Sequence, residues 1–343
     1  MKLMNLLTRT NCNNFSLHVL NFKYIMLDFL KFRTFSQVII SRLLNNSDFE
    51  KLKNKGNHTV IYQHKKDKIK LECRKSKNMA ENEFIFIDIQ ITPHYYFNRY
   101  KHNGNDFTPE NCKKALTEIF FSILKIVSLE YRELQLINLE YGVNILPETD
   151  INNLIKGILF YKKTSFVTNN TIQTYKITEA TSYKQIKAYG KGIQFANQPE
   201  YGINNNTFRF EVRSKQAKNI RKLGIYSLDD LFRDEVYQRL GESLLSEWGN
   251  ILLVNLEPDI KGLKPAEVKY ITEANKIEFW ITKLQNPYRN CYAREVKKYY
   301  KKSQKKDNLH HKIRGLLIDK VYDLLGGANS TQKTLIDSKF FKN

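Results

Sequence analysis

Polar and apolar residues alternate along several short segments of the chain, as they do in half-buried β-strands. Successive strand residues point to opposite faces of a sheet, so this alternation indicates one buried face. The segments that predict strands are also rich in β-branched and aromatic residues, and they are 26–33, 60–63, 69–73, 84–91, 135–145, 171–179, 183–189 and 207–213. Several are close enough in sequence to pair as antiparallel hairpins.

Other segments have apolar residues at helical spacing, and the helices predicted from them cover about 35–54, 108–127 and 149–161. The second of these begins at Thr108-Pro109-Glu110, an N-cap followed by residues suited to a first turn. Residues 26–213 therefore predict an α+β domain, an antiparallel sheet with crossing helices. Residues 214–343 predict a mostly helical, basic region, and residues 1–25 predict an extension that is disordered or upstream of the true start.

The charge of the chain favours a polyanionic partner. Lys and Arg number 56 against 35 Asp and Glu, which gives a formal charge of +21. Such a surplus attracts nucleic acid, whose phosphates would supply most of the affinity. The four cysteines form no CxxC zinc or redox motif, and no apolar run approaches the roughly 18 residues of a membrane span. We therefore expect a cytoplasmic protein with no membrane partner.

A basic stretch near the C-terminus strengthens the prediction of nucleic-acid binding. Tyrosines are interleaved with its cations, a combination that suits phosphate contacts and base stacking. The alternative is a solvated helix face. The residues predicted to bind nucleic acid are Arg294, Lys297, Lys298, Lys301, Lys302, Lys305 and Lys306.

Three residues are candidates for a metal site. His94 and His102 share one polar loop directly after a strand, and Glu140 lies on a sheet face. A carboxylate beside an imidazole can bind Mg²⁺ or Mn²⁺. The spacing of eight residues between the two histidines is no recognised zinc signature. The alternatives are therefore a pair of surface loop histidines and a solvent-facing glutamate.

Two tyrosines are candidates for a nucleophile. Tyr189 ends a predicted strand and is followed by Gly-Lys-Gly, so Lys191 could stabilise its anion or bind a phosphate. Tyr201 lies in the next loop and is a rival. On the following strand Arg209 alternates with aromatic residues, which predicts a charged face that meets DNA or positions a metal ligand. The alternatives are an ordinary strand-end tyrosine and an edge strand with a salt-bridged outer face.

Taken in order, these segments resemble the filamentous-phage gene II replication initiators, the phage X family, and more distantly the plasmid rolling-circle initiators. The resemblance covers about 26–235, and its most specific part is an Arg-x-Glu strand followed by Leu-Gly-Ile and Leu-x-Asp-Leu. The matching segments are 26–31, 91–98, 102–107, 139–141, 187–192, 208–213, 223–225 and 228–231. The chain lacks a His-hydrophobic-His pair, and Gly190 stands where Asp or Asn is common.

The resemblance implies an HUH-like nuclease relative that nicks one strand of replicative DNA at a phage or plasmid origin. It implies a 5′-phosphotyrosine intermediate, a 3′-OH for rolling-circle synthesis, Mg²⁺ or Mn²⁺, and a host polymerase and helicase as partners in a bacterial cytoplasm. Tyr189 and Tyr201 fit the nucleophile about equally, with a preference for Tyr189 because of Lys191. The alternatives are a non-catalytic DNA- or RNA-binding protein, and a relaxase or recombinase with the same chemistry.

Overall fold

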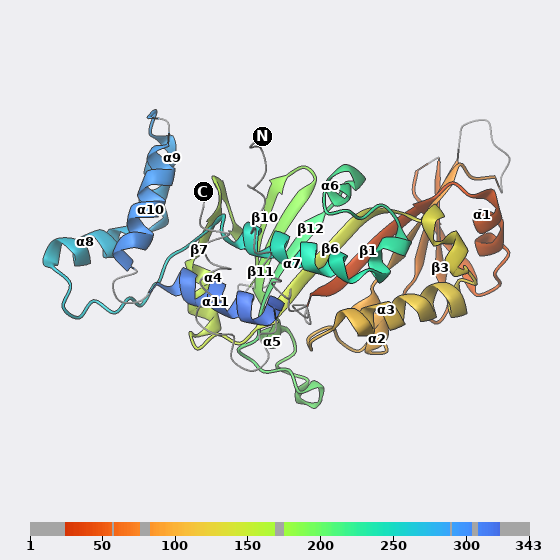
Figure 1. The fold of residues 1–343 in the computed structure, drawn as a ribbon, viewed down its shortest axis with the longest axis horizontal. Helices are drawn as coiled ribbons and strands as arrows, with labels where there is room; N and C mark the ends of the chain where they lie inside the picture. The colour runs from red at the N-terminus through yellow and green to blue at the C-terminus, as the bar shows by residue number, and fades with distance from the viewer. Residues whose placement is uncertain are drawn as a thin grey trace, which may run out of the picture.

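The computed structural model describes residues 25–56, 58–75, 83–168, 175–288, 290–303 and 308–322. Its main feature is a ten-stranded sheet in the order β2-β3-β4-β5-β1-β6-β12-β11-β10-β9, in which all neighbours are antiparallel (Figure 1). Its strands are β1 (Met26–Thr34), β2 (Phe49–Asn54), β3 (Thr59–His64), β4 (Lys70–Arg74), β5 (Phe86–Ile91), β6 (Gln135–Ile145), β9 (Val167–Thr168), β10 (Tyr175–Thr181), β11 (Lys184–Gly190) and β12 (Phe208–Ser214).

The two halves of this sheet repeat one topology. In each half a first strand is followed by a helix and then by four strands, the last of which returns to pair with the first. The first strands, β1 and β6, pair with each other at the centre of the sheet. The small strands β7 (Ile158–Tyr161) and β8 (Thr164–Ser165) are inserted into the second half. There β7 pairs with both β8 and β13 (Ile251–Leu253) in a separate sheet.

Helices connect and cover these strands. The α-helices are α1 (Gln37–Leu44), α2 (Pro93–Phe97), α3 (Pro109–Thr117), α4 (Ile151–Gly157), α5 (Lys191–Gln194), α6 (Ala217–Arg221), α7 (Asp234–Trp248), α8 (Pro265–Ala274), α9 (Ile277–Gln285), α10 (Cys291–Ser303) and α11 (Leu309–Tyr322). A π-helical turn covers Glu118–Ile123, and 3₁₀ turns cover Ser128–Glu133, Pro199–Tyr201 and Leu228–Phe232. The predicted α+β class, with a large antiparallel sheet and a helical C-terminal region, is confirmed.

One face of the second half of the sheet packs against helix α7. Phe208 and Phe210 of β12 contact Trp248 edge-on, with ring centroids 6.1 and 5.2 Å apart. Helix α11 packs against α7 and β6, and its His310 ring stacks on Trp248 at 5.5 Å. Because strand side chains alternate, this packing directs Arg209, which lies between the two phenylalanines, to the opposite face.

Helices α8, α9 and α10 form a second, smaller core around Trp280, at one end of the molecule (Figure 1). This core is joined to the rest through β13: the Tyr299 hydroxyl accepts from the amide of Asn255, and the Tyr300 hydroxyl bonds to Leu253 and Ile251. The division between the two cores thus falls within the helical region, since α7 and α11 share the core of the large sheet.

Three predicted helices differ from the structure in extent. The helix over 35–54 ends at Leu44, and its last part is the edge strand β2, which pairs with β3. The helix over 149–161 gives way to β7, and the helix over 108–127 loses its α-helical geometry after Thr117. No helix in the described part of the chain is long and apolar enough to cross a membrane. The predicted 1–25 extension lies outside the described residues apart from Ile25, which is buried.

Candidate active site

The register of the central strands brings distant residues onto one face of the sheet. Arg209 of β12 lies opposite Asn144 of β6 on one side and opposite Tyr189 of β11 on the other. Two residues further along, Glu211 lies between Gly142 and Lys187. All of these positions are on the face away from Trp248, so a patch of polar side chains forms where the apolar core does not reach.

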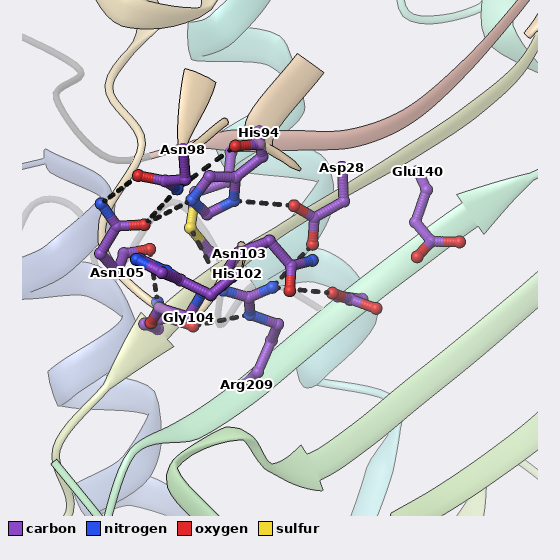
Figure 2. A network of polar contacts seen from close by, with 12 residues as sticks. Asp28, His94, Asn98, His102, Asn103, Gly104, Asn105, Glu140 and Arg209 are labelled. Atoms are coloured by element: carbon purple, nitrogen blue, oxygen red, sulfur yellow. Dashed lines mark hydrogen bonds and ion pairs between the residues drawn. The ribbon is translucent and has the colours of Figure 1, made fainter. Parts of the chain in front are cut away.

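Arg209 is the centre of a buried hydrogen-bond network (Figure 2). Its guanidinium donates to Asp28 Oδ2 at 2.8 Å, to Asn144 Oδ1 at 2.7 Å and to the carbonyl of Asn103. The side chain has no exposed surface. A charge this deep needs a partner, and Asp28 supplies it. Burial alone would raise the pKa of Asp28, but the Arg209 charge and the His94 hydrogen bond hold it well below its usual value.

His94, at the start of α2, is fixed on both sides of its ring. Nδ1 lies 2.9 Å from Asp28 Oδ1, and Nε2 lies 2.9 Å from Asn105 Oδ1. The ring stacks on Phe107 at 4.6 Å between centroids. Burial lowers the pKa of His94 despite the neighbouring carboxylate. The histidine therefore connects the loop containing Asn105 to strand β1.

Tyr189 and Glu211 form a hydrogen-bonded pair within this network. The Tyr189 hydroxyl donates to Glu211 Oε1 at 2.8 Å, and the tyrosine is only 8% exposed. Burial and the Glu211 charge raise the pKa of Tyr189 well above its usual value. Burial and the nearby Glu140 raise the pKa of Glu211 to about 8. In its ionised form, a carboxyl group with this proton affinity can take a proton from a phenol.

A glycine makes room for Glu211. A Cβ on Gly142 would lie 2.7 Å from Glu211 Cγ and 2.6 Å from the carbonyl oxygen of Phe210. Such distances are shorter than any ordinary contact, so a side chain at position 142 would displace the glutamate or its strand.

Two lysines flank the pair. Lys187 Nζ lies 2.6 Å from Glu140 Oε1 and 3.5 Å from Glu211 Oε2. Lys191, at the start of α5, donates to Asn103 Oδ1 at 2.6 Å and to Gln194 Oε1 at 3.0 Å. Its ammonium group is buried, and burial together with the Arg209 charge lowers its pKa to about 7. Lys191 Nζ lies 5.5 Å from the centroid of the Tyr189 ring. The sequence predicted this proximity, because Lys191 follows Tyr189 by two residues.

Tyr201 lies in a more open place. Its ring is half-buried and lies 4.6 Å from the ring of His102. Burial, with smaller contributions from His94 and Lys191, lowers the pKa of His102. The residues after Tyr201 line a groove of 630 Å³ together with α11, Asn105 and Asn144. The groove therefore shares two residues with the buried network.

The predicted metal ligands do not converge. Both ring nitrogens of His94 are engaged, His102 packs on Tyr201, and Glu140 lies apart from them beside Lys187 and Arg213 (Figure 2). The described residues contain no group of three or more His, Cys, Asp or Glu side chains that could hold a metal ion. As arranged here, His94, His102 and Glu140 do not fit one ion, and dependence on Mg²⁺ or Mn²⁺ stays a prediction.

The basic stretch lies on helix α10, and its lysines are not equivalent. Lys298 and Lys302 lie over the Tyr270 ring of α8, at 4.5 and 4.7 Å from its centroid. Exposed Arg294, Lys297 and Lys301 follow one another at helical spacing on a different side. Lys305 and Lys306 lie outside the described residues.

Six site residues were not predicted from sequence, and three of them left a signal. Asp28 interrupts the apolar first half of β1, while Lys187 and Glu211 alternate onto the faces of Tyr189 and Arg209. The asparagines left none. Asn103 and Asn105 lie in a loop that folds back over the sheet, and Asn144 of β6 acts through its contacts with that loop and with Arg209. The missed residues are Asp28, Asn103, Asn105, Asn144, Lys187 and Glu211.

The network combines a phenol with a carboxyl acceptor, two buried cations and an adjoining open groove. Such a set can transfer a proton from the phenol and stabilise negative charge beside it. No family model matches the chain, and no curated protein matches it significantly.

Proposed function

We propose that this protein nicks and rejoins one strand of DNA through a tyrosine, as a replication initiator of a phage or plasmid. The observation that carries the proposal is the hydrogen bond of 2.8 Å from Tyr189 to Glu211, whose pKa is raised to about 8. A nucleophile beside a base of suitable pKa is the arrangement that covalent catalysis requires.

In the proposed step, the Tyr189 oxygen attacks phosphorus and its proton passes to Glu211. The bond from phosphorus to the 3′ oxygen breaks, and that oxygen takes a proton from solvent to become the 3′-OH. The 5′ phosphate stays on the tyrosine as a diester. The ammonium form of Lys191 stabilises charge on the phosphate. Each of the three guanidinium nitrogens of Arg209 donates within the network, so Arg209 keeps Asp28 and the Asn103 loop in place. No step is assigned to a metal ion.

Tyr201 is the rival nucleophile. Tyr189 is buried, so a phosphate must enter where its hydroxyl now meets Glu211, whereas Tyr201 is half-buried beside the groove. Access therefore supports Tyr201, and activation supports Tyr189. The proposal extends to an HUH-like relationship of the sheet, to action in a bacterial cytoplasm, and to a host polymerase and helicase that would use the 3′-OH.

The test is a nicking assay on supercoiled DNA of the protein's own replicon, with Mg²⁺, with Mn²⁺ and with EDTA. Tyr189→Phe should keep DNA binding and lose both nicking and the covalent adduct. Tyr226→Phe is the matched control, since Tyr226 is 58% exposed and lies outside the network. Peptide mapping of an adduct on a suicide oligonucleotide identifies the nucleophile.

Each outcome is informative. An adduct at Tyr201 would replace the nucleophile and keep the reaction class. If wild-type protein forms neither nick nor adduct under any of these metal conditions, the initiator proposal fails. A non-catalytic DNA- or RNA-binding protein would then be the better description.

DNA binding has its own test, the dependence of affinity on salt. The +21 charge predicts a steep fall of affinity with salt. Replacing the exposed Arg294, Lys297 and Lys301 by Ala should reduce the slope by roughly one unit per lost phosphate contact. Replacing Lys298 and Lys302, which lie over Tyr270, should change it less. Equal slopes for all variants would mean that α10 does not face DNA.

A further inference from the structure

A second cavity lies where the two cores of the protein meet, among residues that the proposed nicking site does not use. It has a volume of 550 Å³, within the range of about 300–1,000 Å³ typical of ligand pockets. Its walls are the end of α7, strand β13, one side of α10 and the first turns of α11. None of the residues that hold Arg209 or Tyr189 lines it.

The charged residues that line this cavity are all basic. Lys162, Lys297 and Arg314 line it, together with His310 and His311. Among the described residues that line it there is no aspartate or glutamate. Lys162 and Lys297 are exposed on this wall, and their positive charge favours an anionic ligand such as a phosphate.

Flat rings form another part of the wall. Tyr292 and Tyr300 line the cavity, and the Tyr300 ring stacks with His310 at 4.7 Å between centroids. His310 in turn stacks on Trp248. The aliphatic side chains of Leu252 and Val296 complete the surface. Aromatic rings beside cations form the setting in which proteins stack unpaired bases.

His310 also supplies an unused hydrogen-bonding atom. It is 6% exposed, its Nε2 lies 3.3 Å from the carbonyl oxygen of Trp248, and its Nδ1 has no partner among the described residues. Because Nε2 must donate to that carbonyl, Nδ1 is an acceptor. A buried acceptor without a donor is costly, and an amino or imino group of a base would satisfy it.

We propose that this cavity binds one nucleotide, with the base against the tyrosines and His310 and the phosphate on Lys162 and Lys297. The nucleotide is either a unit of a single DNA strand or a free mononucleotide. This binding does not depend on the proposed nicking chemistry, and it assigns a specific role to one side of α10.

The experiment measures binding by the full chain, without cleavage. The probes are a short labelled oligothymidine, followed by fluorescence anisotropy, and dAMP, followed by equilibrium dialysis. The Lys162→Ala/Lys297→Ala variant should bind about tenfold more weakly, since each lost charge-assisted contact contributes substantially to affinity. The matched control is Lys298→Ala/Lys302→Ala, which removes the same charge outside the cavity, over Tyr270, and should change binding much less.

A second variant separates the cavity from general charge. Ala293 lines the cavity and is exposed, so Ala293→Trp should fill the space without removing a cation or a core side chain. Circular dichroism melting checks that each variant is folded. Loss of oligothymidine binding alone assigns the cavity to a DNA strand, and loss of dAMP binding as well assigns it to nucleotides in either form.

Two results would overturn the proposal. The first is that Ala293→Trp leaves the binding of oligothymidine and dAMP unchanged, while the two double-lysine variants weaken that binding equally. The other is competition by inorganic phosphate as strong as that by dAMP, because it would show that the rings and His310 recognise no base.

Discussion

Asp28 offers the sharpest test of the buried network. Asp28→Asn keeps the shape of the side chain and removes the charge that balances Arg209, whose guanidinium lies 2.8 Å away with no exposed surface. Removing one partner of a buried ion pair typically costs about 3–5 kcal/mol, because the other charge is left uncompensated. We expect the free energy of unfolding to fall by that amount.

The measurement is urea unfolding near pH 7, followed by tryptophan fluorescence. Glu130→Gln is the matched control, because it also replaces a carboxylate by an amide. The Glu130 carboxylate accepts from Arg42 at 2.6 and 2.8 Å, and this ion pair is partly exposed to solvent. Exposed pairs contribute about 0–1 kcal/mol. If Asp28→Asn costs no more than Glu130→Gln, the network does not depend on the charge of Asp28, and this reasoning is refuted.

The pH dependence gives a second check on Asp28. Its pKa is held well below the ordinary value in the folded state, so its ionised form adds stability above the unfolded pKa of about 3.9. That contribution is lost as the pH falls through the lower, folded pKa. The difference between wild type and Asp28→Asn should therefore be constant above about pH 5 and shrink in stronger acid.

Two other predictions concern the same region. Nicking requires ionised Glu211 and protonated Lys191, whose pKa values are shifted to about 8 and to about 7. The nicking rate should therefore follow a bell-shaped pH profile centred between these values. Lys191→Arg should move the alkaline limb of that profile to higher pH. A Cβ on Gly192 would lie 2.0 Å from the carbonyl oxygen of Asn204, so Gly192→Ala should cost about 1–3 kcal/mol in urea unfolding. Gly249→Ala, with its nearest atom at 3.4 Å, is the control, and equal losses in the two variants would contradict the packing argument.

Most strands were predictable because one of their faces is buried. Apolar and polar residues alternate in strands such as β6 and β12, and their positions follow from the sequence within a few residues. Strand β2 was missed because it is almost wholly exposed along its length, which leaves no alternation to detect. Its strand conformation comes from pairing with β3, a tertiary effect that overrides local propensity. The repeat of topology between the two halves is likewise invisible as a sequence repeat.

The candidate site was predictable in its strand residues and not in its connections. Tyr189, Lys191 and Arg209 were found because a tyrosine or cation at a strand end is conspicuous. Their partners were not, since Asp28 lies 66 residues from His94 and 181 residues from Arg209. No local pattern specifies contacts across such distances.

The arrangement of strands has a consequence for how the protein reaches its native state. The pairs from β2 to β5 and from β10 to β12 join strands that follow one another in the sequence. In contrast, β1 meets β6, and β6 meets β12, only after long stretches of chain have been synthesised. Closing long loops slows folding, so the local hairpins should form early and the central seam late. Asp28 and Arg209 sit on opposite sides of β6, at that seam. A newly made chain would therefore acquire its candidate active site last, after both halves of the sheet have formed.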